Sequence, residues 1–212
     1  GGRARLGVGS GIVVDSDPAR EYAECLLKSR FLTGFDPGFE LIETMCLEAG
    51  QYRFMAQHLE RLEASATALG FACSIPEISA ALAKQADGRA NGACRVRLTL
   101  GHDGDFRISM APILAVKQPA HVVLANERLD AEDYLLRHKT TARSRYDRVL
   151  ADLAKHAQVF DAIFLNTRGE VCEGARSNVF VQRDGVLLTP PLACGVLPGV
   201  MRRHLIATGQ AV

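Results

Sequence analysis

Two residues between positions 138 and 178 have the types that could carry out chemistry on an aldehyde cofactor. Lys139 lies in a run rich in arginine and threonine that has no hydrophobic period of its own, so its amine need not lie on a solvated helix face. Glu173 ends a short strand-like segment and precedes Gly174, where the backbone can turn sharply and approach a ligand. An amine can condense with an aldehyde, and a carboxylate can keep the ring nitrogen of a cofactor protonated. The two residues together suggest covalent cofactor chemistry as a hypothesis.

The elements before these residues predict a small α/β lobe over residues 34–118. Residues 39–54 alternate as in a hairpin that turns near Gly50. An amphipathic stretch that ends just before Gly70 favours a helix, with His58 and Arg61 on a different face from its apolar side chains. The expected elements are this hairpin, helices over 55–69 and 76–86, and strands over 94–100 and 106–113.

A second, larger lobe is expected over residues 121–212, after the break at Pro119. Apolar runs separated by glycine turns predict a series of strands, and Pro198-Gly199 precedes a helix. The sequence stops directly after this helix, so we expect the lobe to be truncated at its C-terminus. The expected elements are strands over 121–125, 161–166, 170–174, 177–182 and 186–190, and helices over 148–157 and 200–207.

Composition limits the classes of partner. The net charge of +1, from 25 basic and 24 acidic side chains, gives no electrostatic reason to expect nucleic acid or an anionic membrane. Six scattered cysteines form no CxxC pair and have no histidine nearby at zinc-ligand spacing, so we expect reduced thiols and no metal. Since no long apolar run and no signal peptide are present, we expect a soluble, cytoplasmic protein.

Residues 1–32 have the pattern of a glycine-rich loop, a strand over 11–14 and a helix opened by Asp17-Pro18. The string GVGSGIVVDSDPAREYAECLLKSRFL resembles the C-terminal end of chorismate-utilising synthases such as aminodeoxychorismate synthase. In that family the acid matched by Glu24 helps to hold magnesium. So short a segment cannot complete such a site, and neither Glu24 nor Lys28 is assigned to catalysis. The resemblance implies that this chain is cut from a longer, bifunctional one.

Four further segments resemble the class IV, or fold type IV, aminotransferase-like family of pyridoxal-phosphate enzymes: HLERL (58–62), HKTTAR (138–143), LNTRGEVCEGARSNVFV (165–181) and LLTPPLACGVLPGVMRR (187–203). The resemblance implies a two-lobed α/β fold, with a small α/β lobe, a larger barrel-like lobe with a mixed sheet, and pyridoxal 5'-phosphate in the cleft between them. It also implies a homodimer.

The same resemblance implies roles for individual residues. Lys139 would bind the cofactor aldehyde and shuttle protons, and Glu173 would pair with the ring nitrogen. Arg61 would bind the phosphate, as the planar guanidinium fork allows. The other cofactor-binding positions that it implies are Asn178 and the backbone around Gly199, Val200 and Met201, where free N–H groups at a helix start favour an anion.

Three functions stay open. A lyase would release pyruvate from aminodeoxychorismate to leave 4-aminobenzoate, a step of folate precursor synthesis, and a transaminase would act on branched-chain or D-amino acids with 2-oxoglutarate. The synthase-like N-terminus favours the lyase. So do Ser144, which stands where branched-chain transaminases typically carry tyrosine, and Met201, which stands where transaminases usually carry threonine. The third function is a non-catalytic appendage of a synthase, against which the retention of Lys139, Glu173 and Arg61 argues.

The sequence also offers candidates for substrate contacts and for protein partners. Thr44 could lie near the substrate, and Arg143, Arg145 and Arg176 are candidates for binding its carboxylates. His58 and His138 are assigned to structural roles, because a lone histidine is more often a satisfied hydrogen-bonding group than a catalyst. The expected protein partners are a second copy of the chain, a synthase domain on the same natural chain and a glutamine amidotransferase subunit.

Overall fold

The computed structural model describes residues 7–9, 17–19, 21–22, 24–25, 36–87, 92–113, 115–116, 118–155 and 158–212, and the chain divides into two compact units, 1–38 and 39–212. In the first unit, the Asp17 carboxylate accepts a hydrogen bond from the Ala19 N–H at 2.8 Å, as expected of a helix N-cap. Glu24 is exposed. The strand predicted over 11–14 and Lys28 lie outside the described residues.

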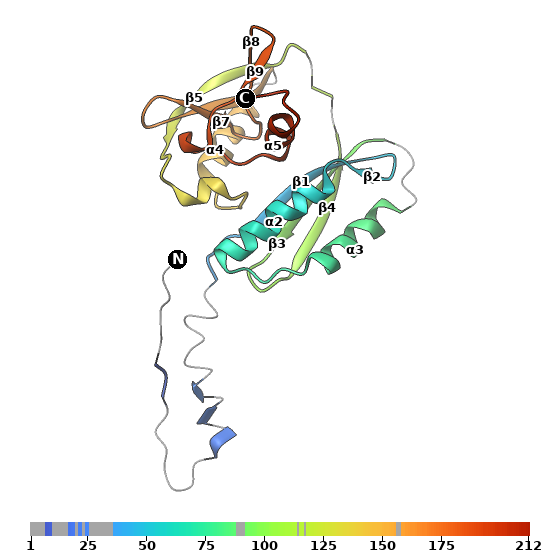
Figure 1. The fold of residues 1–212 in the computed structure, drawn as a ribbon, viewed down its shortest axis with the longest axis vertical. Coiled ribbons are helices and arrows are strands. Elements are labelled where there is room, and N and C mark those ends of the chain that lie inside the picture. The colour runs from blue at the N-terminus through green and yellow to red at the C-terminus, as the bar shows by residue number, and fades with distance from the viewer. Residues whose placement is uncertain are drawn as a thin grey trace. The chain divides into compact units, whose positions relative to one another are not determined.

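The small lobe of the second unit is an antiparallel sheet with two helices (Figure 1). The strands follow the order β2-β1-β3-β4 in the sheet. Its elements are β1 (Leu41–Glu48), β2 (Gln51–Tyr52), α2 (Met55–Leu69), α3 (Ile75–Ala86), β3 (Cys94–Leu100) and β4 (Phe106–Pro112). The predicted hairpin, helices and strands are confirmed. Gly70 ends α2 at a φ of 78°, a left-handed conformation that glycine adopts without steric cost.

The core of this lobe lies between the sheet and the two helices. Alternate residues of β1 point into it, and Leu41, Met45 and Leu47 are almost fully buried there. Glu43 occupies the same face of the strand and is only 1% exposed. A carboxylate therefore stands in the middle of an apolar row.

The larger lobe has a mixed sheet in the order β5-β6-β7, with β5 parallel and β7 antiparallel to β6, and a separate hairpin of β8 and β9 (Figure 1). Its own core is built around residues such as Leu129, Phe164 and Val196. Its elements are β5 (His121–Leu129), the 3-10 helix η1 (Tyr134–Arg137), α4 (Ser144–Leu153), β6 (Val159–Asn166), β7 (Val171–Gly174), β8 (Val181–Arg183), β9 (Val186–Leu188), the 3-10 helix η2 (Leu192–Cys194) and α5 (Val200–Ala207).

Three sequence predictions in this lobe need correction. Helix α4 begins at Ser144 and ends at Leu153, four residues before the predicted start and end, because Tyr146 packs into the core together with Val149, Leu150 and Leu153. The strand predicted over 177–182 begins only at Val181. The residues before it form a loop held by a buried carboxylate, since Asp161 accepts hydrogen bonds from the Arg176 N–H at 3.3 Å and the Ser177 hydroxyl at 2.5 Å. Strand β5 also runs four residues beyond its predicted end.

The cysteines, the helices and the possible metal ligands were also checked against the structure. All six cysteines are free thiols. Within the described part of the chain, no helix is long and apolar enough to cross a membrane, and no group of three histidine, cysteine or acidic side chains could hold a metal ion.

Candidate active site

The segment that carries Lys139 is hydrogen-bonded to the start of β1 in the small lobe. The Ile42 N–H donates to the Lys139 carbonyl at 2.8 Å, and the Thr141 N–H donates to the Glu40 carbonyl at 2.8 Å. The Thr141 hydroxyl in turn accepts from the Glu40 N–H at 2.8 Å. These bonds fix the backbone at the lysine carbonyl and two residues after it, so the side chain starts from a fixed point between the two lobes.

A cavity of about 430 Å³ surrounds Lys139 and is lined by residues of both lobes. This size is typical of a small-molecule site. Burial, together with the positive charges of Arg61 and Arg143, lowers the pKa of the Lys139 amine to about 8, against the opposing effect of Glu43 and Glu173. The cavity also contains Arg61, Asn178, Gly199, Val200 and Met201, so the predicted site residues lie around one space.

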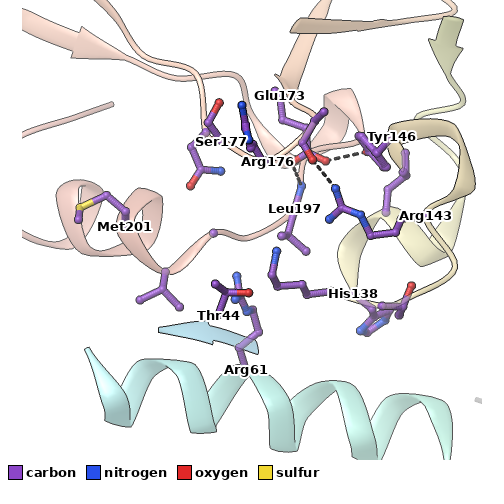
Figure 2. A pocket seen from close by; sticks show the side chains of 18 of the residues that line it. Thr44, Arg61, His138, Arg143, Tyr146, Glu173, Arg176, Ser177, Leu197 and Met201 are labelled. Atoms are coloured by element: carbon purple, nitrogen blue, oxygen red, sulfur yellow. Dashed lines mark hydrogen bonds between the residues drawn. The ribbon is translucent and has the colours of Figure 1, made fainter. Parts of the chain in front are cut away.

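Glu173 lies on one wall of the cavity and is 7% exposed (Figure 2). One of its carboxylate oxygens accepts from the Tyr146 hydroxyl at 2.8 Å, and the other accepts from the Leu197 N–H at 3.0 Å. Burial raises the pKa of Glu173, although these donors and the charges of Lys139 and Arg143 act in the opposite direction. Burial, together with the neighbouring Glu173, also raises the pKa of Tyr146, so the phenol stays a donor.

Only glycine fits at position 174, next to Glu173, because neighbouring side chains leave no room for a Cβ atom. A Cβ there would lie 2.3 Å from the Ser177 Oγ and 2.4 Å from an oxygen of Asp161. The backbone can therefore pack against the buried Asp161 only where no side chain is present. The close contacts at Gly174 are with the protein's own side chains, and the predicted approach of this backbone to a ligand stays a prediction.

Arg61 lies on the opposite wall, with Thr44 of β1 beside it (Figure 2). Its guanidinium donates twice to Glu43, from Nε at 2.7 Å and from Nη2 at 2.6 Å. The Nδ1 of His58 lies 2.6 Å from the same carboxylate. Although His58 and Arg61 were expected away from the apolar face of α2, both are buried and turn toward the sheet.

The start of α5 is close to Arg61. Nη1 of Arg61 donates to the Pro198 carbonyl at 3.3 Å, one residue before the N-cap Gly199, and none of the side chains that the structure describes caps this helix. A Cβ at Gly199 would lie 2.1 Å from the Asn178 Oδ1, so the absence of a side chain there makes room for Asn178. An uncapped helix start with a nearby arginine is an arrangement that binds anions.

The substrate candidates differ in their partners. Arg143 donates to Asp147 at 3.0 Å and to the Ala175 carbonyl at 2.5 Å. Arg176 donates to the Phe160 carbonyl and lies over the Phe160 ring, 4.6 Å from its centroid. Arg143, Arg145, Arg176 and Thr44 all line the cavity, but the first and third have their guanidinium groups engaged by the protein itself.

His138 lines the cavity and contacts α2, and the structural role expected of it stays a prediction. Its Nδ1 lies 3.0 Å from the Ser65 hydroxyl, and its ring packs against Tyr134 with centroids 4.8 Å apart. Burial and the neighbouring Arg137 lower the pKa of this imidazole. The contact to Ser65 joins α2 to the residue just before Lys139.

Two residues that hold other side chains of the site in place, Tyr146 and Glu43, were missed from the sequence. Tyr146 falls within RSRYDR, a polar run that gave no sign of a buried face. Glu43 had a visible signal, because it stands at the core-facing period of the strand LIETMCLE, between Leu41 and Met45. An acidic residue in such a row indicates a buried pair.

Comparisons with known proteins agree with this geometry. Residues 40–212 match the family of class IV amino-transferases, and residues 1–34 match the family of chorismate binding enzymes. A provisionally assigned aminodeoxychorismate lyase of Schizosaccharomyces pombe is 27% identical over 80% of this chain and 74% of its own length. A crystal structure of a provisionally assigned amino-acid aminotransferase from Mesorhizobium loti is 42% identical, with a TM-score of 0.75, over 82% of this chain and 85% of that one.

A crystal structure of a provisionally assigned 4-amino-4-deoxychorismate lyase from Legionella pneumophila is 25% identical, with a TM-score of 0.69, over 81% of this chain and 69% of that one. The matching family covers both lobes and every residue that lines the cavity. The chain therefore belongs to the class IV amino-transferase family of enzymes.

Proposed function

We propose that this chain is a pyridoxal-phosphate-dependent lyase that converts 4-amino-4-deoxychorismate to 4-aminobenzoate and pyruvate. The match of residues 1–34 to chorismate binding enzymes, directly before the class IV domain, carries the proposal. A synthase that makes aminodeoxychorismate would then share one chain with the enzyme that consumes it. The similarity to the Schizosaccharomyces pombe protein gives further support.

The cavity fits the cofactor on two grounds. The uncapped start of α5 and the guanidinium of Arg61 together suit a phosphate. Glu173 is a buried carboxylate that, among the described residues, forms hydrogen bonds with neutral donors and no ion pair, so it suits a cationic ring nitrogen. Arg61, Gly199, Val200 and Met201 would hold the phosphate, and Asn178 would support that loop.

When bound, pyridoxal phosphate supplies an electron sink that stabilises the charge left as a C–H bond next to the substrate amine ionises. Lys139 would hold the cofactor aldehyde and then take and return the proton at that carbon. Its lowered pKa of about 8 suits both tasks, because a larger fraction of the amine is neutral near pH 7 than for an ordinary lysine.

Glu173 would keep the ring nitrogen protonated. Tyr146 and the Leu197 N–H hold both oxygens of the carboxylate, so its orientation toward the cavity does not depend on a ligand. Glu173 is buried on this wall, and burial strengthens the interaction between its carboxylate and a cation.

A second function, transamination of branched-chain or D-amino acids, is favoured by one observation. The Mesorhizobium loti structure, provisionally assigned as an amino-acid aminotransferase, shares 42% identity over most of both chains. Both reactions begin with loss of a proton next to the amine and diverge at the next step, where the lyase expels a leaving group and the transaminase returns the proton to the cofactor.

Association with other chains is proposed by resemblance. We expect a homodimer, a synthase domain on the natural chain and contact with a glutamine amidotransferase subunit, in the cytoplasm. Light scattering on the purified chain would test the dimer, and a mass corresponding to a single chain at working concentration would refute it.

Two parallel assays test the proposed function. Purified chain with pyridoxal phosphate and aminodeoxychorismate should release pyruvate and 4-aminobenzoate in equal amounts. A parallel reaction with a D- or branched-chain amino acid and 2-oxoglutarate should yield no glutamate. Glutamate in the second reaction with no product in the first would establish the transaminase instead. Protein that takes up no pyridoxal phosphate and shows no visible absorption band would exclude both enzymes.

A further inference from the structure

Glu43 is a charged residue in a position that apolar residues normally occupy. It shares the core-facing side of β1 with Leu41 and Met45 and has almost no contact with solvent. A buried carboxylate is costly unless it is paired and hydrogen-bonded. Glu43 therefore needs hydrogen-bonding and charged partners at this position, and residues of α2 provide them.

Both partners of Glu43 come from adjacent turns of α2. Arg61 donates through Nε to one oxygen and through Nη2 to the other, and His58 contacts the second oxygen through Nδ1. Burial alone would raise the pKa of this carboxyl, but the hydrogen bonds and charges of His58 and Arg61 bring it below its ordinary value. Glu43 is therefore an anion inside the lobe.

The pairing leaves one edge of the guanidinium for the cavity. Nε and Nη2 of Arg61 are directed at Glu43, while Nη1 reaches the Pro198 carbonyl at 3.3 Å, beside the start of α5. Arginine has many rotamers, and a ligand that must select one of them binds more weakly than one that meets a fixed group. Here the carboxylate has already selected the rotamer.

We propose that Glu43 is a positioning residue for phosphate recognition: it holds Arg61 so that the guanidinium and the N-terminus of α5 converge on one phosphate group. The inference rests on the proposed binding of pyridoxal phosphate in this cavity. Glu43 itself does not line the cavity, and it acts through Arg61. Its negative charge opposes phosphate binding, so the net effect depends on orientation outweighing charge.

The test compares two ligands that differ only in the phosphate. Apo protein is titrated with pyridoxal phosphate and with pyridoxal, and the visible absorption band reports binding. Glu43→Gln keeps the shape of the side chain but turns an N–H₂ toward a donor, so Arg61 loses one of its two anchors. We expect the affinity for pyridoxal phosphate to fall about tenfold to a hundredfold, the range for a hydrogen bond to a charged group, while the affinity for pyridoxal changes little.

Matched variants separate positioning from general damage. Glu48→Gln removes an exposed carboxylate from the end of the same strand and should leave both affinities unchanged. Arg61→Gln should remove the preference for the phosphorylated ligand, and adding Glu43→Gln to it should have no further effect. Glu43→Asp keeps the charge but shortens the side chain, and it serves if the glutamine variant does not fold; it should show the same selective loss.

Three results would overturn the inference. Equal loss of both affinities in Glu43→Gln would mean that the residue only stabilises the lobe. Unchanged or tighter binding of pyridoxal phosphate would mean that the negative charge of Glu43, not the orientation of Arg61, governs the site. If the wild-type chain binds neither ligand, the proposed function fails as well, whereas the first two results leave it standing.

Discussion

Two buried glutamates, one in each lobe, differ in how their charge is compensated. Glu43 in the small lobe is paired with Arg61 and His58, and the pKa of Glu43 is lowered even though burial acts to raise it. Glu173 in the larger lobe accepts hydrogen bonds from a phenol and a backbone N–H, and burial keeps its pKa raised. One ion pair is complete within the chain, while the other carboxylate has neutral donors and, among the described residues, no ion-pair partner.

This difference indicates that Glu43 orients another side chain, whereas Glu173 is placed to interact with a ligand. A carboxylate whose counter-charge is built in fixes another side chain and stays unchanged through the reaction. A carboxylate held by neutral donors keeps its geometry but gains most from a cationic ligand, because burial penalises the bare charge. The wall carrying Glu173 therefore suits the ring nitrogen, and the wall carrying Glu43 and Arg61 suits the phosphate.

The largest effect is expected from Lys139, whose pKa is influenced by both glutamates. Lys139→Ala removes the amine that would hold the cofactor and move the proton, so turnover should fall by at least about 10²–10⁴-fold, and the absorption band of the bound cofactor should disappear. Spectra and product release check this. Lys155→Ala, at an exposed lysine paired with Asp152, is the control and should behave as wild type. An active Lys139→Ala chain would refute the assignment.

The second effect is on stability and should separate the two glutamates directly. Glu43→Gln removes the counter-charge of a buried arginine and should lower the free energy of unfolding of the apo protein by about 3–5 kcal/mol. Glu173→Gln breaks no ion pair among the described residues and should cost about 1 kcal/mol or less. Urea unfolding measures both. If the two variants lose the same free energy of unfolding, then the proposed difference between Glu43, which is paired with Arg61, and Glu173, which has only neutral donors, is wrong.

The third effect is on turnover. Glu173→Gln should lower kcat by about a hundredfold, because a neutral amide holds the ring proton less well, while pyridoxal phosphate should still bind through Lys139 and through its phosphate. This pattern is the reverse of the one expected for Glu43→Gln, which weakens binding of the phosphorylated ligand. Steady-state kinetics at saturating cofactor would show it. Unchanged turnover would remove Glu173 from the reaction.

The sequence predicted elements where local signals are strong. Helices α2 and α5 have their predicted bounds because Gly70 ends the first and Pro198-Gly199 opens the second. The start of α4 was missed, since only packing against the larger core shows that Tyr146 has a buried face. Such packing depends on residues far away in the sequence, and periodicity does not report it.

The site also contains residues that could be predicted from the sequence and contacts that could not. Lys139, Glu173 and Arg61 could be named from motifs and resemblance, and the structure places them around one cavity. Their supporting contacts could not be named. Arg61 was treated as a side chain off the apolar face of α2, because the pattern of one helix does not show that a strand opposite carries an acid. A buried ion pair joins two elements, and each element by itself shows an ordinary charged residue.

The smallest effect, on the pH dependence of apo stability, has opposite signs for the two glutamates. The lowered pKa of Glu43 means that the unfolded chain binds its proton more readily, so the stability it contributes is present above the unfolded pKa and is lost as the pH falls through the folded one. The raised pKa of Glu173 means the reverse: its contribution is present below the unfolded pKa and is lost as the pH rises through the folded one.

Thermal melts of the apo protein across the acidic range should therefore show an ascending limb that Glu43→Gln flattens and a descending limb that Glu173→Gln flattens. Pyridoxal phosphate should weaken the descending limb, because a cation beside Glu173 favours its ionised form. Pyridoxal, which carries the same ring nitrogen, should do so at higher concentration. A descending limb that neither ligand changes would show that the ring nitrogen does not contact Glu173, whatever effect Glu173→Gln has on turnover.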